Sequence, residues 1–383
     1  MLSQLVEFIR EHYSTKESIP LHSPVFGAAE EALVLDTLRS TFVSSVGAYV
    51  DQFETQLAAF TGAEKAVAVV NGTAALHIAL RLVGVKSGDL VLTQPLSFIA
   101  TVNAIRYCGA QPVFIDIERA TLSLSPMAME QWLTEQAFMD DQGICRHRDT
   151  NAVIRACVPM HTFGHPADLN SLMSVCARWN IALVEDAAEA LGSYRGGRHV
   201  GTWGKASALS FNGNKIITTG GGGAVLTDTQ SAVWVKHMTT TAKVPERQDF
   251  THDDVGYNYR LPNLNAALGC AQMSRLLAYV QEKRLLASEY RHIFQDSPYS
   301  FVDEPEGTQS NFWLNAIVAE DRPARDFMLQ ETQAKGIQTR PAWRLLHQQS
   351  MYEECLRGEL KVAEDLAERL VNLPSSVRRS TVL

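Results

Sequence analysis

The chain lacks every cysteine pattern that would hold a metal ion or a disulfide framework. Its 383 residues include only six cysteines, and no two of them form a C-x-x-C pair. The 11 histidines show no metal-ligand spacing either, so we predict no metal site. Free, buried thiols are typical of a reducing compartment, and we expect a cytoplasmic protein. The six residues are Cys108, Cys145, Cys157, Cys176, Cys270 and Cys355.

Long apolar runs and clusters of positive charge are also absent. No stretch approaches the ~18 apolar residues of a membrane-spanning helix, and residues 1–16 lack the apolar core of a secretory signal. The chain has 34 basic and 42 acidic residues, a net charge of −8, and no Lys/Arg-rich run. We therefore predict no membrane insertion and no nucleic-acid partner, and an anionic substrate would need a local basic pocket.

The sequence does contain a regular alternation of apolar runs and helical segments. Helices are predicted over 73–83, 100–107 and 169–179, between the apolar runs. Strands joined by such helices form right-handed crossovers, so we predict an α/β fold with a mostly parallel, seven-stranded sheet and helices on both faces. The predicted strands are 66–70, 90–92, 112–117, 153–158, 181–185, 206–211 and 224–227.

The pattern changes near residue 257, where a smaller α+β domain is predicted. We place a large domain over 1–255, including an N-terminal helical segment, and a small C-terminal domain over 256–383. Segments 136–150 and 240–255 show no periodicity and are predicted to be loops. The elements predicted in the small domain are a helix over 264–295, a strand over 312–318 and a helix over 362–371.

Three polar residues follow predicted strands at what should be one edge of the sheet. Asp186 ends one strand, Ser210 ends another, and Lys215 lies five residues further on. Ligands of parallel sheets bind beyond the carboxyl ends of the strands. A lysine that forms a Schiff base, a carboxylate for a ring nitrogen and a hydroxyl for a phosphate are what pyridoxal phosphate needs. Taken singly, each is also typical of a surface lysine, a helix-capping aspartate and a strand-end serine.

A third strand end leads into a helix at Asn71, Gly72 and Thr73. The unpaired N–H groups of a first helical turn suit a phosphate, and glycine permits close backbone approach. An ordinary N-cap explains the same residues equally well. The segment is not a Walker loop because no Gly-Lys-Ser/Thr follows it, and no G-x-G-x-x-G follows the first strand, which argues against a Rossmann dehydrogenase.

Further candidates are weaker when they are considered alone. Phe98 has a ring that can stack on a pyridine, although single aromatic residues are more often part of a core. Asn258 and Arg260 can reach a phosphate, including one in a neighbouring subunit, or can belong to a simple turn. His161 follows a strand and is predicted to face the site, or to be structural. The run of four glycines at 220–223 permits a tight turn beside a cofactor.

These segments, in this order, resemble the DegT/StrS family of pyridoxal-phosphate-dependent sugar aminotransferases. The resemblance extends from residues 46–54 to 371–374, and the ordered set of motifs is highly specific. Three stretches are most similar to the 4-aminotransferases of the legionaminic acid pathway, namely 161–165, 211–219 and 260–265. The resemblance implies fold type I of these enzymes, a homodimer with shared active sites, and L-glutamate as amino donor.

The resemblance also implies a role for individual residues. Lys215 matches the Schiff-base lysine and Asp186 the partner of the ring nitrogen. Gly72, Thr73 and Ser210 match phosphate ligands, Asn258 an asparagine that reaches the phosphate across the dimer, and Phe98 a stacking aromatic residue. The substrate contacts that we predict are Ser44, His161, Arg260, Arg340 and His347, and the two arginines among them are candidates for a pyrophosphate clamp.

Two positions depart from the pattern that is common in the family. Glu189 stands where many members have a glutamine that contacts the ring hydroxyl, so it can donate a hydrogen bond only when it is protonated. Gly221 replaces an acidic residue that follows the lysine in many members. This second change can reshape the substrate pocket, but it removes no known proton carrier.

The function implied is amino transfer from glutamate to C4 of a nucleotide-linked 4-keto-6-deoxy sugar, with pyridoxamine phosphate as intermediate. We expect a UDP- or GDP-linked 2-acetamido-2,6-dideoxy sugar, in the synthesis of nonulosonic acid or of a surface polysaccharide such as the lipopolysaccharide O-antigen. A sugar dehydratase of the same fold is the alternative, but such enzymes carry histidine where this chain has Lys215. A non-catalytic protein of this fold would not need both Lys215 and Asp186.

Overall fold

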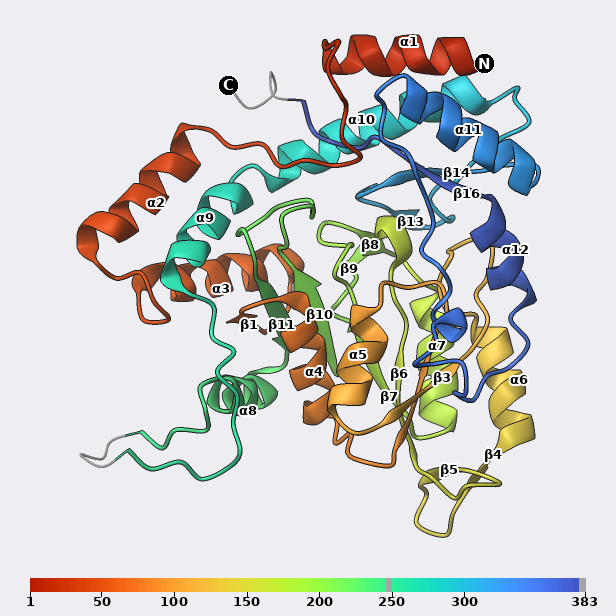
Figure 1. Ribbon diagram of the computed structural model, residues 1–383. Coiled ribbons are helices and arrows are strands. Elements are labelled where there is room, and N and C mark those ends of the chain that lie inside the picture. The colour runs from red at the N-terminus through yellow and green to blue at the C-terminus, as the bar shows by residue number, and fades with distance from the viewer. Residues whose placement is uncertain (246–249, 379–383) are drawn as a thin grey trace.

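A seven-stranded sheet forms the centre of the computed structural model, which describes residues 1–245 and 250–378 (Figure 1). β11 runs antiparallel to both of its neighbours, β1 and β10, whereas the other neighbouring strands are parallel. The predicted mostly parallel sheet is therefore confirmed. Its order is β1 (Lys65–Val69), β11 (Gly223–Thr227), β10 (Ala206–Ser210), β7 (Ala182–Asp186), β6 (Ile154–Val158), β2 (Leu90–Thr93) and β3 (Gln111–Phe114).

Helices cover both faces of this sheet because successive strand residues point to opposite sides. Val67 and Val69 belong to one buried cluster with residues of α4, α5 and α8. Ala66 and Ala68 belong to another cluster, with residues of α3 and α9. α6 and α7 cover the same side further along the sheet. These helices are α3 (Ala48–Thr61), α4 (Gly72–Leu82), α5 (Ala100–Tyr107), α6 (Pro126–Gln136), α7 (Leu169–Arg178), α8 (Thr229–Thr239) and α9 (Asn263–Met273).

The C-terminal part of the chain forms a second, antiparallel sheet that is flanked by helices. Its order is β12 (Ser300–Phe301), β14 (Asn315–Val318), β16 (Leu370–Leu373) and β15 (Arg340–Pro341). The helices of this region are α10 (Leu276–Phe294), α11 (Arg322–Ala334) and α12 (Lys361–Arg369).

The N-terminal helix α1 (Leu2–Tyr13) packs on this C-terminal region (Figure 1). Leu5 and Ile9 are fully buried in the cluster that contains Tyr290 and Val371. We predicted this segment to belong with the large domain, and its packing corrects that assignment. The apolar face of α1 gives no information about which sheet it covers. α2 (Ala28–Ser40) lies beside α9 at the periphery of the molecule.

Two smaller sequence predictions also need correction. Segment 136–150, predicted to be a loop, contains a short hairpin of β4 (Ala137–Met139) and β5 (Cys145–His147), too short for its alternation to be recognised. The strand predicted over 312–318 begins only at Asn315, because Phe312 has a φ of 46° that is incompatible with a strand. Of the predicted loop 240–255, residues 246–249 lie outside the described residues. No helix among the described residues is long and apolar enough to cross a membrane.

Candidate active site

A cavity of about 330 Å³ lies at the carboxyl edge of the large sheet, within the size range of small-molecule sites. β1, β7 and β10 end at this edge, which brings together residues that are far apart in the chain. Seven of the eight predicted cofactor ligands line it, and the eighth, Asn258, does not. The lining includes Gly72, Thr73, Phe98, Asp186, Glu189, Ser210 and Lys215, together with Asn71, Met160, Asn212, Asn214, Trp313 and Trp343.

Asp186 is a buried carboxylate at the floor of this cavity. Its Oδ2 accepts a hydrogen bond from the Thr101 hydroxyl at 2.7 Å, and its Oδ1 accepts one from the Ala188 N–H at 3.2 Å. Burial raises the pKa of Asp186 above its usual value, and the hydrogen bond from Thr101 works against that rise. A cation placed beside this carboxylate would relieve the cost of burying the charge, so the site favours a protonated ring nitrogen.

Glu185 points to the opposite side of β7, as the alternation of strand side chains predicts. Its carboxylate accepts hydrogen bonds from the N–H groups of Gly201, Trp203 and Gly204, at 2.6–2.8 Å. Burial alone would raise the pKa of Glu185, but hydrogen bonds, first the one from His161, hold it below its usual value. Glu185 is therefore a structural carboxylate that anchors the turn before β10.

His161 is the partner of that structural carboxylate, which corrects its predicted role as a substrate contact. Its Nε2 lies 3.2 Å from Oε2 of Glu185, and its Nδ1 accepts from the N–H of Ala167 at 3.1 Å. These bonds require the tautomer with the proton on Nε2. The side chain is fully buried and both ring nitrogens are engaged, so none is left for a ligand.

Lys215 reaches the cavity from the loop after β10. Its Nζ lies 3.2 Å from Oε1 of Glu189 and 4.2 Å from the centre of the Trp313 ring, and only 12% of the side chain is exposed. An amine that is largely shielded from water is suited to attack on a carbonyl in its neutral form, and the carboxylate beside it can exchange a proton with it.

Glu189 is fully enclosed between Lys215 and the backbone of Phe163. The N–H of Phe163 donates to its Oε2 at 2.9 Å, from a residue whose φ of 57° is unusual for a non-glycine. Burial raises the pKa of Glu189 to about 7, and the nearby Lys215 charge opposes this rise. The neutral form of Glu189 is therefore accessible near neutral pH, and it has the hydrogen that the glutamine of other family members would supply.

Glu189→Gln should change how the stability of the cofactor-free protein depends on pH. A carboxyl with a pKa near 4.5 when unfolded and about 7 when folded stabilises the folded state below pH 4.5. This contribution falls as the pH rises to 7, by about 3 kcal/mol in the free energy of unfolding. Urea unfolding of both proteins from pH 5 to 8 should therefore show the wild type losing stability relative to the variant. Parallel curves would contradict the raised pKa.

The junction of β1 and α4 is built for close approach, and glycine is required there. A Cβ on Gly72 would lie 2.9 Å from Cβ of Ser210, and a Cβ on Gly223 would lie 2.5 Å from the carbonyl of Asn71. The Asn71 side chain caps the helix by accepting from the N–H of Ala74 at 2.8 Å. The N-cap explanation is thus correct, but the first turn of α4 also opens into the cavity beside Ser210. The cradle fits a phosphate.

Phe98 lies where the sequence predicts a residue that stacks on the cofactor. Its side chain lines the cavity and is 51% exposed, so its ring is free to stack on a planar ligand. Gly221 does not line the cavity. It meets only one atom at 4.0 Å where a Cβ would stand, so an acidic side chain would have room there, and its predicted effect on the substrate pocket stays a prediction.

Besides His161, five predicted residues do not line this cavity. Asn258 is exposed. Ser44 lies on the loop before α3, and its carbonyl accepts a hydrogen bond from the N–H of Asn263. Arg340 is exposed on β15. His347 is buried, with Nε2 3.3 Å from Glu364, in the short helix η2 (Leu346–Gln348). Arg260 pairs with Val69, and its Nε is buried without a hydrogen-bond partner among the described residues. Their predicted contacts with substrate or cofactor stay predictions.

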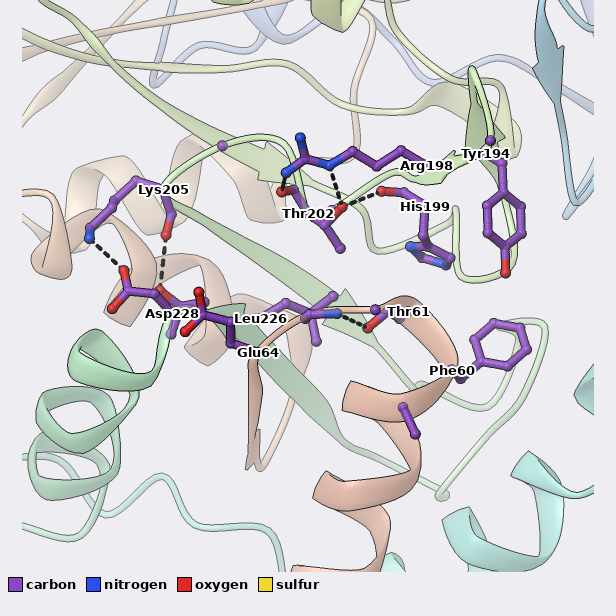
Figure 2. A pocket seen from close by; sticks show the side chains of 17 residues that line it. Phe60, Thr61, Glu64, Tyr194, Arg198, His199, Thr202, Lys205, Leu226 and Asp228 are labelled. Atoms are coloured by element: carbon purple, nitrogen blue, oxygen red, sulfur yellow. Dashed lines mark hydrogen bonds and ion pairs between the residues drawn. The ribbon is translucent and has the colours of Figure 1, made fainter.

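A larger cavity of about 720 Å³ lies at the opposite edge of the sheet, and another lysine, Lys205, lines it (Figure 2). Lys205 precedes β10, and its Nζ lies 2.5 Å from Oδ2 of Asp228. Figure 2 shows this ion pair directed away from His199 and Arg198. Lys205 is half-exposed and far along the strand from Ser210, so size alone does not identify the reactive cavity.

Three side chains of the site were not singled out from the sequence. Thr101, on α5, holds Asp186, while Trp313 and Trp343 come from the C-terminal region. A serine or threonine early in a helix is usually a local cap, and a tryptophan beside apolar residues is usually core. Only the fold brings these residues to the cavity.

Comparisons with known proteins identify the family. The sequence profile of the DegT/DnrJ/EryC1/StrS aminotransferase family matches residues 25–381. GDP-perosamine synthase of Escherichia coli O157:H7 is 35% identical over 358 residues, which cover 93% of each chain. EpsN of Bacillus subtilis, assigned as a pyridoxal phosphate-dependent aminotransferase, is 33% identical over 365 residues, covering 94% of this chain and 91% of EpsN.

Solved structures agree with this result. The aminotransferase TlmJ of Streptoalloteichus hindustanus superimposes with a TM-score of 0.83 at 28% identity, over 93% of each chain. Helicobacter pylori PseC, at 24% identity and a TM-score of 0.84 over 94% of each chain, has the same fold. The predictions of fold type I, of pyridoxal phosphate as cofactor and of the family are confirmed. The finer resemblance to the legionaminic acid pathway is not shown by these relatives. The chain belongs to the DegT/DnrJ/EryC1/StrS aminotransferase family.

Proposed function

We propose that this enzyme transfers an amino group from L-glutamate to C4 of a nucleotide-linked 4-keto-6-deoxy sugar. The observation that carries the proposal is the convergence of Lys215, Asp186 and the Gly72–Ser210 cradle on one cavity. A relative named for a GDP-linked product, GDP-perosamine synthase, supports a nucleotide sugar as substrate. A 2-acetamido-2,6-dideoxy sugar on UDP or GDP is our preferred substrate, in nonulosonic acid or surface polysaccharide synthesis in the cytoplasm.

We assign the cofactor contacts as follows. Gly72, Thr73 and Ser210 would hold the phosphate at the first turn of α4, where the N–H groups point outward from the helix. Asp186 would hold a positive charge on the ring nitrogen, and Phe98 would cover one face of the ring. When bound, pyridoxal phosphate supplies an electron sink for the carbon that loses a proton.

The chain's own residues then handle the protons. Nζ of Lys215 would accept the α-proton of glutamate as general base and would then donate a proton as general acid. Glu189, 3.2 Å from Nζ, stabilises the ammonium form of the lysine between these two transfers. Asp186 stays ionised throughout. The same groups serve the second half-reaction, in which the amino group passes to the keto sugar.

Two half-reactions with separate readouts test the proposal. Glutamate alone should convert the protein with bound cofactor from the visible-absorbing to the near-ultraviolet form and release one 2-oxoglutarate per site. Addition of a 4-keto-6-deoxy sugar nucleotide should restore the visible band and give an amino sugar detectable by mass spectrometry. No response to glutamate, or loss of oxygen rather than gain of nitrogen by the sugar, would reject amino transfer and favour a dehydratase.

We further propose that the active form is a homodimer with shared sites. α2 buries only Glu30 and Thr37, although the helix and the loop after it are rich in apolar side chains. Apolar surface of this kind is characteristic of an interface. We propose that a second copy covers it and that Asn258 and Arg260 serve the partner's site. The exposed apolar residues there are Leu35, Leu38, Phe42, Val43 and Val46, and Phe26 lies just before the helix.

Leu38→Glu should therefore give a monomer of low activity, because a charge would be buried in the interface. Light scattering after size exclusion measures the mass, and circular dichroism checks that the monomer is folded. Met127→Glu is the matched control, since Met127 on α6 is also exposed but lies outside this surface. A wild-type protein that is monomeric and fully active at assay concentration would refute the dimer.

A further inference from the structure

Trp313 makes two contacts with the loop that carries the reactive lysine. Its indole ring lies under Nζ of Lys215, with 4.2 Å between the nitrogen and the ring centre. Its Nε1–H donates to the carbonyl oxygen of Asn214, the preceding residue, at 2.7 Å. One side chain thus touches the amine and fixes the backbone from which the lysine extends. Together they limit the directions in which Nζ can point.

The backbone of Trp313 is also held at both of its polar groups. Its N–H donates to Oδ1 of Asn311 at 2.8 Å, and its carbonyl accepts from Nζ of Lys283 at 3.1 Å. Lys283 is 1% exposed, and burial lowers the pKa of its amine to about 7. A buried lysine is costly, so its presence behind Trp313 indicates that this backbone position is held firmly.

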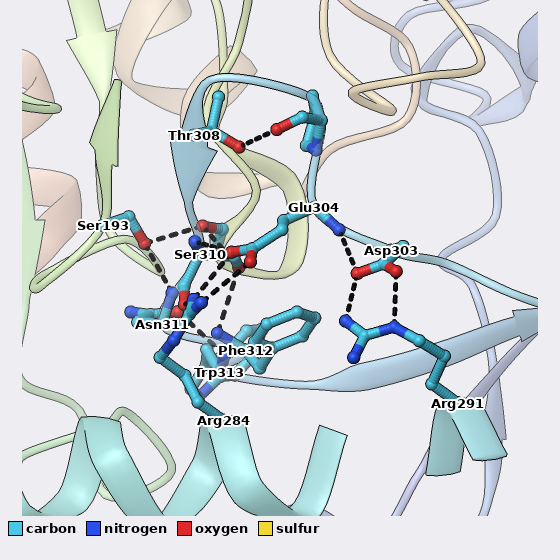
Figure 3. A network of polar contacts seen from close by, with 12 residues as sticks. Ser193, Arg284, Arg291, Asp303, Glu304, Thr308, Ser310, Asn311, Phe312 and Trp313 are labelled. Carbon is cyan, nitrogen blue, oxygen red and sulfur yellow. Dashed lines mark hydrogen bonds and ion pairs between the residues drawn. The ribbon is translucent and has the colours of Figure 1, made fainter. Parts of the chain in front are cut away.

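The segment before Trp313 is locked to the large domain by a polar network (Figure 3). Nδ2 of Asn311 donates to the carbonyls of Glu189 and Leu191, both at 2.9 Å. The Ser193 and Ser310 hydroxyls both donate to the carbonyl of Gly164, at 2.7 and 3.0 Å. The same network therefore connects the backbone of Glu189, next to the lysine, with the segment that presents Trp313.

This segment is held in a conformation that needs external support. Phe312, directly before Trp313, has a φ of 46°, in the region where non-glycine residues are strained. Arg284 on α10 clamps the same segment, because its guanidinium binds both carboxylate oxygens of Glu304 and the carbonyl of Ser310 at 2.6–2.8 Å. Ordinary core packing of one tryptophan would require neither the strain nor the clamp.

We propose that Trp313 is a positioning residue that holds Lys215 in the conformation needed to bond to the cofactor. The inference depends on the proposed role of Lys215. The ring face limits where the ammonium can move, and the Nε1–H bond fixes the turn at Asn214. Loss of Trp313 should therefore weaken the covalent link between lysine and cofactor more than it weakens the non-covalent fit of the cofactor.

Affinities for two ligands separate these effects. Pyridoxal phosphate bonds to the lysine, whereas pyridoxamine phosphate occupies the same pocket without such a bond. For Trp313→Leu we expect about a tenfold loss of affinity for pyridoxal phosphate, because a lysine that is no longer confined must be ordered when the bond forms. Affinity for pyridoxamine phosphate should change by less than about twofold. Trp313→Phe retains a ring near Nζ but loses the hydrogen bond to Asn214, and it should show a smaller selective loss.

Reference variants make every outcome decisive. Lys215→Ala should lose the visible band and all of the preference for pyridoxal phosphate over pyridoxamine phosphate. If it keeps them, the proposed role of Lys215 is wrong, whatever the Trp313 variants show. Trp343→Phe changes the other indole of the cavity, which makes no cation–π contact with Lys215 among the described residues. It should not alter the ratio of the two affinities. Equal losses for both ligands in the folded Trp313→Phe protein, or no loss for either, would overturn the positioning role.

Discussion

Lys215→Ala is expected to reduce amino transfer by about 10³-fold or more, because a positioned general acid–base alone contributes 10²–10⁴-fold and the covalent anchor is lost as well. The variant should still fold. Among the described residues, the Lys215 side chain takes part in no polar network other than its contacts with Glu189 and Trp313. Its removal leaves Glu189 without the cation, which the raised pKa of that carboxyl allows it to tolerate by protonation. Turnover with glutamate and the visible spectrum are the measurements.

Lys205→Ala is the matched control for that experiment. Lys205 lies at the opposite edge of the sheet and makes an exposed ion pair with Asp228, of a kind that contributes about 0–1 kcal/mol. Its loss should leave turnover unchanged. If Lys215→Ala keeps substantial activity and Lys205→Ala loses it, the chemistry takes place in the larger cavity and the proposed site is wrong. If Lys215→Ala is as active as Lys205→Ala, Lys215 has no role in the mechanism.

The positions of Asp186, Ser210 and Lys215 were predictable because each depends on local rules. A short apolar run fixes where a strand ends, and the parallel order of strands brings those ends to one edge. The alternation of side chains along β7 then distinguishes Asp186 from Glu185. These inferences need no knowledge of tertiary contacts, and the ends of β7 and β10 agree with them to within one residue.

His161 and Trp313 show where such local rules end. His161 follows a strand like Asp186 does, yet its ring turns inward to Glu185 because a buried carboxylate there needs a donor. Trp313 lies almost 100 residues beyond Lys215, and tertiary contacts such as those of Asn311 with the large domain bring it to the amine. Side-chain partners of this kind have no periodicity, so the sequence pattern contains no signal for them.

Asp186→Asn should reduce the rate of the glutamate half-reaction by about 10²–10³-fold, the loss typical of removing one preorganised electrostatic contact. The side chains have almost the same shape, and asparagine can still receive the Thr101 hydrogen bond, so the site should remain folded. The amide has no charge, however, and it offers no counter-ion to a protonated ring nitrogen. The loss should therefore appear in the rate of proton removal rather than in assembly of the site.

Stopped-flow spectroscopy of Asp186→Asn with saturating glutamate separates these quantities. The visible band should be present before mixing, because Lys215 is intact, and it should decay slowly afterwards. Thr101→Val is the matched control: it removes one hydrogen bond to the same carboxylate but keeps its charge, so we expect a much smaller effect, about tenfold. If Asp186→Asn reacts as fast as Thr101→Val, the charge of Asp186 does not drive the reaction. The buried carboxylate would then be only a structural partner of α5, held at the floor of the cavity by Thr101.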